Sequence, residues 1–461
     1  SPSQEPQIAF DFGPVSYSSV ALADINNNGR QDVLVTGHAI VGGRNITLYQ
    51  NNGGGDFSVV DDLPFKAVSY GAMAFSDVDG DGDQDLLITG RTNESTGGTI
   101  SFPKLTATLY LNDGNGDFTE VSGTPFEPVE CGSVAFADVD NDKDMDVFIS
   151  GMGQTTVMGS EKVSILYLND GSGNFSEDVT ASFTPVSQSS ALFMDAEDDG
   201  DMDLVLTGDS NSGLVANLYK NDGMGIFSEM SGLPFEGISS GQIATADVTN
   251  NSKTEADIIF TGLSNVGGEY KGIAKLYLNN GKGLFEENAE CSFKGVEKSS
   301  VAFADVDGDR DKDVLIAGLD TATNKPVTKL YLNQDGSGNF VESKNNSFEG
   351  IMHGTLTFFD FDRDNDQDVL ITGSGLADFS KTAVLYLNDG SGHFQKVSTG
   401  DFSGLSKPSI DYADIDNDQD QYFMISGSDS TKLYINDGKG FYTLAENEVF
   451  PGVENGSIAF G

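Results

Sequence analysis

One line of sequence recurs eight times along the chain, and this repetition restricts the possible folds more than any other feature. Each copy holds a short apolar run, an aspartate-rich loop, a second apolar run that ends in Gly, and a later segment of the type LYLNDGxGxF. The first aspartates of the loops lie 52 to 61 residues apart, at Asp24, Asp77, Asp138, Asp195, Asp247, Asp305, Asp360 and Asp414. Self-similarity at such a period indicates a solenoid, a propeller or an array.

The pieces of each repeat have the character of β-strands. Runs such as SVAFAD, DLLITG and ATLYLN are short, rich in β-branched and aromatic residues, and bounded by Gly and Asp. The NDGxG segment predicts a hairpin turn, because Asn, Asp and Gly accept the positive φ of tight turns. Four antiparallel strands per repeat form the blade of a propeller. We therefore predict an all-β fold, a β-propeller of four-stranded antiparallel blades with eight blades, or alternatively seven blades plus extra strands.

The whole chain, 1–461, is expected to form a single propeller domain. The predicted repeats span 19–71, 72–132, 133–190, 191–241, 242–299, 300–354, 355–408 and 409–455. The C-terminal NGSIAFG is a truncated ninth copy of the first strand, and the N-terminal PQIAFDFGPV resembles the end of a fourth strand. We expect the terminal segments 1–18 and 456–461 to supply strands for ring closure, which removes an open sheet edge.

The chain is strongly acidic, with 72 acidic and 25 basic residues and a formal net charge of −47. This charge argues against nucleic acid and anionic membranes as partners and favours cations. The only two cysteines, Cys131 and Cys291, form no disulfide framework and are expected to be distant, unpaired thiols. No run approaches the roughly 20 apolar residues of a membrane span, so no transmembrane segment is predicted.

The aspartate-rich loops have the pattern D-x-D-x-D-x-x-x-D, which places carboxylates at loop positions 1, 3, 5 and 9. Such clustered charges repel one another unless a cation neutralises them. Oxygen ligands select a hard cation, and Ca²⁺ accepts six to eight of them in flexible geometry, whereas Mg²⁺ demands an octahedron. An EF-hand is excluded because it needs a Glu at position 12 and flanking helices, and this position is Ile88 or Ile149 here.

Six loops are predicted to bind Ca²⁺, with position 7 contributing its backbone carbonyl. Their positions 1, 3, 5, 7 and 9 are Asp24, Asn26, Asn28, Arg30 and Asp32; Asp77, Asp79, Asp81, Asp83 and Asp85; Asp138, Asp140, Asp142, Asp144 and Asp146; Asp195, Glu197, Asp199, Asp201 and Asp203; Asp305, Asp307, Asp309, Asp311 and Asp313; and Asp360, Asp362, Asp364, Asp366 and Asp368. The amides of the first loop predict weaker binding. The fifth loop has an insertion before Asp257 and is expected to be empty. The eighth keeps Asp414, Asp416 and Asp418 but has Tyr422 at position 9, which predicts weak or no binding.

Calcium at these loops predicts a location outside the cell. With about 1 mM free calcium and a Kd of ~10⁻⁴ M, each site stabilises the fold by about 1.4 kcal/mol. Six such sites add about 8 kcal/mol, which is comparable to the whole net stability of a domain. Most of this stabilisation is lost at cytosolic calcium concentrations, so we expect a secreted or cell-surface protein.

The segments ADVDGDRDKDVLIAG and LYLNDGSGNF resemble the FG-GAP/VCBS-type repeat family, which includes the propeller of integrin α chains. The resemblance covers essentially the whole chain. It implies propeller blades with calcium in the loop between the first two strands, at the positions named above except in the fifth and eighth loops. Integrin propellers have seven blades, so eight complete copies depart from that pattern.

The segments after the second strand of each repeat vary most, and strand alternation places them on the face opposite the aspartate-rich loops. Binding residues favour variable loops on a rigid scaffold. The basic and aromatic candidates on this face are Arg44, Arg91, Phe102, Lys104, Tyr270, Lys271, Lys325, Phe379 and Lys381. We predict a monomeric, non-catalytic adhesion or ligand-binding module for a protein or a glycan.

Two other functions are kept as alternatives. One is a polysaccharide lyase or hydrolase on a propeller scaffold, for which His38 and His353 lie on the variable face while His393 lies in an NDGxG-type turn. No nucleophile motif accompanies these histidines, so an enzyme is not expected. The other is a structural module of a longer surface protein.

Overall fold

The computed structural model describes residues 10–11, 15–39, 43–53, 56–95, 103–154, 160–249, 255–362, 364–375, 381–397, 409–413, 422–427, 430–436, 442–444 and 448–449. Every regular element among these residues is a β-strand, which confirms the predicted all-β class. No helix capable of crossing a membrane occurs in this part of the chain.

Each of the first four repeats forms four successive antiparallel strands, with the first strand of the second repeat split into β6 and β7. These strands are β2 (Val15–Ala23), β3 (Asp32–Ala39), β4 (Gly43–Gly53) and β5 (Asp56–Val60); β6 (Val68–Ser69), β7 (Met73–Ser76), β8 (Asp85–Ser95), β9 (Pro103–Asn112) and β10 (Phe118–Glu120); β11 (Val129–Ala137), β12 (Asp146–Gln154), β13 (Ser160–Asn169) and β14 (Phe175–Glu177); and β15 (Val186–Met194), β16 (Asp203–Ser210), β17 (Gly213–Asn221) and β18 (Phe227–Glu229).

The last four repeats follow the same order of pairing, from the first strand to the fourth. Their strands are β19 (Ser239–Ala246), β20 (Asp257–Val266), β21 (Glu269–Asn279) and β22 (Phe285–Glu287); β23 (Glu297–Ala304), β24 (Asp313–Asp320), β25 (Lys325–Asn333) and β26 (Phe340–Glu342); β27 (Met352–Phe359), β28 (Asp368–Ser374), β29 (Lys381–Asn388) and β30 (Phe394–Lys396); and β31 (Ser409–Ala413), β32 (Tyr422–Gly427), β33 (Ser430–Asn436) and β34 (Tyr442–Leu444).

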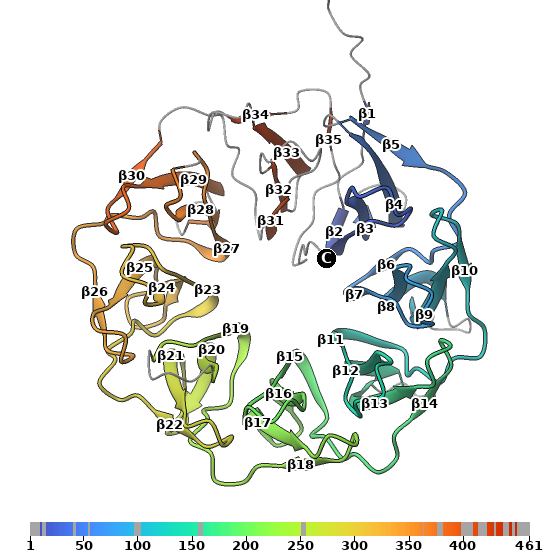
Figure 1. The fold of residues 1–461 in the computed structure, drawn as a ribbon, viewed down its shortest axis with the longest axis horizontal. Coiled ribbons are helices and arrows are strands. Elements are labelled where there is room, and N and C mark those ends of the chain that lie inside the picture. Colours follow the sequence, from blue (N-terminus) through green and yellow to red (C-terminus); the bar gives the residue numbers. More distant parts are fainter. Residues whose placement is uncertain are drawn as a thin grey trace, which may run out of the picture.

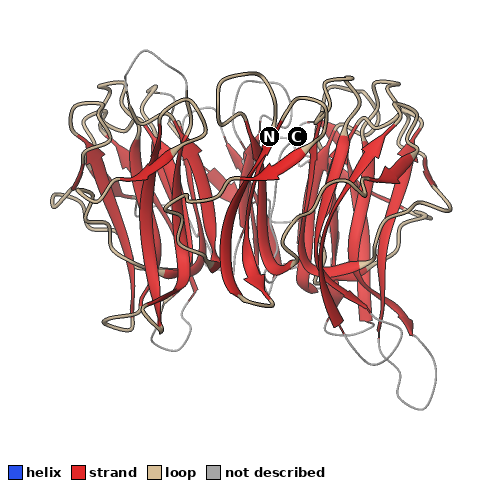
Figure 2. Cartoon of the chain, turned by 90° about the horizontal axis from the view of Figure 1, so that it is seen from below, coloured by secondary structure: helices blue, strands red, loops and turns tan. Residues whose placement is uncertain are grey.

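These strand groups are the blades of a β-propeller. Figure 1 shows them around a ring, with the first strand of each blade nearest the centre and the fourth at the periphery. Seen from the side, the connections gather at the two ends of the strands (Figure 2). We call the end with the aspartate-rich loops and the NDGxG turns the first face, and the end with the connections between second and third strands the second face.

Segments near the two ends of the chain pair with each other, although the C-terminal partner lies in the predicted eighth repeat and not in 456–461. Strand β1 (Phe10–Asp11) pairs in parallel with β35 (Glu448–Val449). Residues 1–9 and 450–461, which include the truncated ninth copy of the first strand, lie outside the described residues. The strands that meet are therefore contributed by sequences more than 400 residues apart.

The core lies between neighbouring blades. Leu87 and Leu109 of the second blade pack against Val147 and Ile149 of the third, and all four side chains are buried. Comparable clusters join each successive pair of blades among the described residues. The second strand of a blade is covered on both sides, which explains why runs such as DVFIS are continuously apolar instead of alternating.

In six of the described blades, an aromatic pair fixes the connection that enters the blade. Phe126, just before β11, packs edge-on against Tyr167 of β13 with ring centroids 5.1 Å apart. The backbone N–H of Glu127 donates to the Tyr167 hydroxyl at 2.8 Å. Six blades share this donor position after the Phe, at Lys66, Glu127, Thr184, Glu236, Lys294 and Glu349. The recurring Phe and Tyr of the sequence therefore position one blade on the next.

Replacing Tyr167 by Phe is expected to lower the free energy of unfolding by about 1–2 kcal/mol, because the Glu127 N–H loses its acceptor in a partly buried site. Urea denaturation at fixed calcium measures this change. Tyr270→Phe is the matched control, since the Tyr270 side chain is 62% exposed. Equal stability of the two variants would contradict a role for this hydrogen bond.

Candidate metal sites

The second loop shows how an aspartate-rich loop is shaped by its own carboxylates. Asp77 accepts hydrogen bonds from the backbone N–H groups of Gly80 and Gly82, at 2.8 and 3.0 Å. Asp81 accepts one from Asp83 N at 3.0 Å. The two glycines have φ of +75° and +94°, a conformation that glycine adopts without steric cost. Positions 1 and 5 therefore fold the loop as well as supplying oxygens.

The aspartate at position 9 joins the loop to the rest of the blade. Asp85 is buried, and its two oxygens accept hydrogen bonds from Val78 N at 2.9 Å and Asn112 N at 2.8 Å. The Asn112 side chain in turn donates from Nδ2 to the carbonyl of Ile25 in the preceding loop, at 2.8 Å. One buried carboxylate thus connects a loop, the end of a third strand and the neighbouring blade.

The fifth loop shows that this connection does not require the full ligand set. Asp257 accepts from Val248 N at 3.0 Å and from Asn279 N at 2.7 Å, although the loop carries an insertion and lacks acidic residues at positions 3 and 5. Thr249 at position 3 forms an isolated β-bridge with Ser337 of the next blade. That the fifth loop holds no calcium, and that the eighth binds it weakly or not at all, stay predictions. The acidic residues of the eighth loop, Asp414, Asp416 and Asp418, lie outside the described residues.

The side chain at position 3 differs from its neighbours because its hydrogen-bonding capacity is not satisfied. In six loops this side chain has a buried oxygen that lacks a hydrogen-bond partner among the described residues. These atoms are Asn26 Oδ1, Asp79 Oδ1, Asp140 Oδ1, Glu197 Oε2, Asp307 Oδ1 and Asp362 Oδ1. A buried polar atom without a partner is costly, and its recurrence at one position calls for a missing partner such as an ion.

Four loops bring carboxylates close enough to share one cation. In each, one oxygen from positions 1, 3 and 9 lies within 4.8 Å of the other two. These groups are Asp77, Asp79 and Asp85; Asp138, Asp140 and Asp146; Asp305, Asp307 and Asp313; and Asp360, Asp362 and Asp368. Oxygens at that separation can both lie about 2.4 Å from one calcium ion, so the donor set and spacing fit Ca²⁺.

The other predicted ligand positions are placed differently. The position 5 carboxylates, such as Asp81, do not belong to the close groups formed by the described residues. The position 7 side chain of Asp83 lies against the NDGxG turn, where a Cβ at Gly114 would be 2.4 Å from Asp83 Oδ2. The same contact recurs for Asp144, Asp201 and Asp366. The first and fourth loops also form no such close acidic group within the part of the chain that is described.

Burial makes the position 9 carboxyls weak acids in the absence of metal. It raises the pKa of Asp85, Asp146, Asp313 and Asp368 to about 7, with smaller contributions from the neighbouring carboxylates of the same loop. The pKa values of Asp32, Asp203 and Asp257 rise to about 6 for the same reason. A bound cation would favour the ionised form of each group.

These shifts predict how stability without calcium depends on pH. A raised pKa means that the folded protein holds these protons more tightly than the unfolded chain, so their stabilising contribution is complete below about pH 4 and is lost as pH rises through about 7. In a chelator, the free energy of unfolding should fall between pH 5 and 8. Saturating calcium should remove this fall, and calcium affinity should increase with pH. A pH-independent calcium affinity, measured by calorimetry, would contradict this expectation.

On the second face, two of the predicted binding residues lie together. The Arg44 Nε donates to Ser69 Oγ at 2.8 Å, and burial and the nearby charge of Arg91 lower the pKa of Arg44. Arg91 forms a two-point ion pair with Glu130, including Nη2 to Oε1 at 2.7 Å, and lies 4.6 Å from the Tyr70 ring centroid. Arg91 therefore links the second and third blades, a structural role that the sequence did not reveal.

The remaining described candidates lie in the second, fifth, sixth and seventh blades. Lys104 is paired with Glu94 at 3.0 Å, whereas Tyr270, Lys271 and Lys325 are exposed. Lys381 begins β29. Phe102 and Phe379 lie outside the described residues.

The three histidines and two cysteines are also separated. His38 is exposed and lies opposite Arg44 in the β3–β4 pair, and His393 is exposed on the first face. His353 lies in the first strand of the seventh blade. Cys131 and Cys291 are unpaired, which confirms the prediction for the thiols.

A feature that the sequence analysis missed is a bulge in the first strand of the blades, toward the second face. Six residues there have positive φ, between 47° and 56°: Tyr70, Cys131, Gln188, Ser240, Lys298 and His353. The pairing register shifts at these points, for example between Glu130 and Ser133. After Cys131, a Cβ on Gly132 would lie 1.7 Å from the Ser150 carbonyl oxygen, so only glycine fits. The signal that could have located the bulge is the small residue after these positions, which is Gly in four blades and Ser after Gln188 and Lys298.

Comparisons with solved structures find many matches of low sequence identity. A lectin of Agrocybe aegerita that recognises non-reducing terminal N-acetylglucosamine is 18% identical, with 83% of this chain and 90% of that chain covered and a TM-score of 0.48. YjhT is 11% identical, with 73% and 99% covered and a TM-score of 0.37. The β-fructofuranosidase of Schwanniomyces occidentalis is 11% identical, with 97% and 91% covered and a TM-score of 0.33. Identities and scores this low leave the function of the chain open.

The family assignment comes from the sequence. No curated protein matches significantly. The FG-GAP-like repeat matches four times, over residues 24–88, 77–149, 305–371 and 360–425, which together cover more than half of the chain. Each matched stretch runs from the aspartate-rich loop of one blade into the second strand of the next. The chain belongs to the FG-GAP-like repeat family.

Proposed function

We propose that this protein is a calcium-stabilised β-propeller that acts outside the cell as a non-catalytic ligand-binding module for a protein or a glycan. The observation that carries the calcium part is the buried, unpartnered oxygen at position 3, which recurs in six loops. In four of these loops the same side chain offers an oxygen within 4.8 Å of two further carboxylates, a separation that suits one cation. A divalent ion there would satisfy the orphaned oxygen and neutralise the cluster.

Calcium would act on the structure through the hydrogen bonds already described. Bound to positions 1, 3 and 9, the ion would hold the loop against the buried aspartate, which in turn holds the third strand and the preceding blade. The amide side chains of Asn26 and Asn28 make the first loop the weakest of the expected sites. Because the formal net charge is −47, each bound calcium ion would also reduce the repulsion among the acidic side chains.

The ligand is proposed to bind on the second face. The first face repeats the same loop and turn in blade after blade, whereas the second-face connections differ in length and chemistry. Tyr270 and Lys271 are both exposed at the tip of the fifth blade, and Lys325 is exposed at the tip of the sixth. Exposed aromatic side chains suit both the apolar face of a sugar and the anchor of a protein interface.

If calcium stabilises the fold, Asp79→Ala should change the free energy of unfolding in opposite directions with and without calcium. Without calcium the variant should be as stable as the natural protein or more so, because a buried oxygen without a partner and its repulsion with Asp77 and Asp81 disappear. With about 1 mM calcium it should be less stable by about 1.4 kcal/mol, the contribution of one lost site. Native mass spectrometry should show one fewer bound ion.

Asp61→Ala removes an exposed aspartate outside the loops and serves as the control for charge. It should leave both the stoichiometry and the calcium dependence of stability unchanged. A natural protein that binds no calcium, with a melting temperature insensitive to chelator, would refute the calcium part of the proposal.

The ligand part is tested by a glycan array and by pull-down of extracellular proteins, both with calcium present. Tyr270→Ala and Lys271→Ala should each weaken binding of the ligand found by about tenfold, the effect of losing an interface anchor. Lys282→Ala, an exposed lysine on the first face, is the matched control. Turnover of an acidic polysaccharide that His38→Ala or His353→Ala abolishes would show that the non-catalytic assignment is wrong.

A further inference from the structure

The fourth blade has a lysine where most other blades have leucine. Lys220 lies in β17 between Tyr219 and Asn221, both of which are buried. The equivalent residues of the LYLN segments are Gln50, Leu111, Leu168, Leu278, Leu332, Leu387 and Ile435. This position is next to the asparagine that binds the preceding loop, so a side chain there lies at the first face, close to the metal loop of its own blade.

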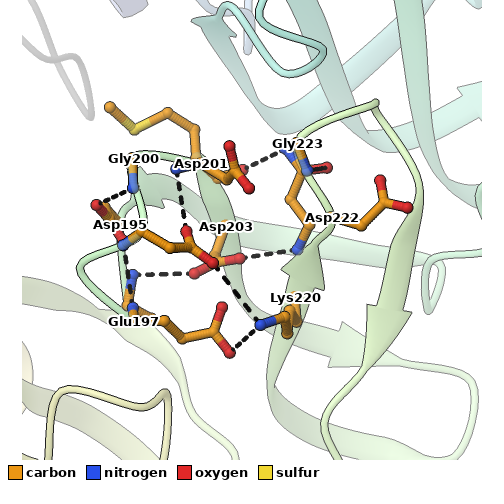
Figure 3. A network of polar contacts seen from close by, with 12 residues as sticks. Asp195, Glu197, Gly200, Asp201, Asp203, Lys220, Asp222 and Gly223 are labelled. Carbon is orange, nitrogen blue, oxygen red and sulfur yellow. Dashed lines mark hydrogen bonds and ion pairs between the residues drawn. The ribbon is translucent and has the colours of Figure 1, made fainter.

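The ammonium group of Lys220 contacts the loop at the positions where a metal ligand is expected. Its Nζ lies 2.6 Å from Glu197 Oε1 and 3.8 Å from Asp199 Oδ2, at loop positions 3 and 5 (Figure 3). The Glu197 side chain is only 10% exposed. A lysine side chain is protonated at physiological pH, so its contact with the Glu197 carboxylate is an ion pair.

The backbone of the fourth loop is otherwise built like the other loops. Asp195 accepts from Gly200 N at 2.8 Å, and Asp203 accepts from Ala196 N at 2.9 Å and Asn221 N at 2.8 Å. The difference is confined to the ligand set: position 3 is Glu, which has one more methylene than Asp and reaches the lysine. Positions 1, 3 and 9 of this loop do not form the close group seen in four other loops of the described chain.

We propose that Lys220 is a built-in cation that takes the place of calcium in the fourth loop, so that this loop keeps its shape without metal. The inference rests on the proposed calcium binding at the other loops and reduces the expected number of strong sites. A calcium ion on Glu197 and Asp199 would lie beside the ammonium, and the repulsion between them would oppose its binding. The fourth blade would then hold its position in the ring at calcium concentrations where its neighbours loosen.

The first test is a gain of binding. Lys220→Leu introduces the residue found in five other blades and exposes the carboxylates to solvent cations. Native mass spectrometry in calcium should count one more bound ion in this variant than in the natural protein. Lys275→Leu is the control: it removes a lysine of the fifth blade that pairs with Glu236 and Glu287, away from any metal loop, and should leave the count unchanged.

The second test uses the natural protein, so it does not depend on how the variant folds. Hydrogen exchange is followed with and without chelator in segments 77–85 and 195–203. We expect the backbone amides of 77–85 to exchange at least tenfold faster in chelator and those of 195–203 to stay protected. Calcium-dependent protection of 195–203, or an unchanged ion count in Lys220→Leu, would overturn the role of Lys220. If amide exchange in neither segment depends on calcium, both the calcium proposal and this inference are overturned.

Discussion

A buried carboxylate with two backbone donors is the constraint on which the first seven blades depend, whereas the eighth has Tyr422 at the same position. The carboxylate fixes the second residue of the loop and the end of the third strand, and the asparagine at that strand end donates to the carbonyl of the preceding loop. The same three bonds recur around the ring, for example through Asp146 and Asn169. In these repeats, the aspartate at position 9 therefore couples the packing between blades to the arrangement of the first face.

This carboxylate would also link a bound cation to the fold. Burial alone makes its ionised form unfavourable, as the raised pKa values show. A divalent ion bound in the loop would offset that cost, while the backbone donors hold the carboxylate from the other side. The fifth blade keeps the buried carboxylate, Asp257, but lacks the other acidic residues of the loop. Its Thr249 instead pairs directly with Ser337 of the next blade.

The repeat predicted the strands, the turns and the aspartate-rich loops because these depend on residues close in sequence. The alternation of Asp and Gly in the second loop, for example, specifies both its φ angles and its carboxylate positions. The contacts of Arg91 with Glu130 and of Lys220 with Glu197 could not be predicted, since they join residues 39 and 23 positions apart on different strands or loops. The first-strand bulge was missed because it depends on how closely neighbouring strands approach.

The meeting of β1 with β35 has a consequence for biosynthesis. Blades made early can pack on one another as they leave the ribosome, because each interface joins consecutive repeats. The ring cannot close before β35 has been made, so until then the flank of the first blade that faces the last blade lacks its neighbour. Shielding of that flank by a chaperone, or by the opening segments of the chain itself, would protect the nascent protein from aggregation during this interval.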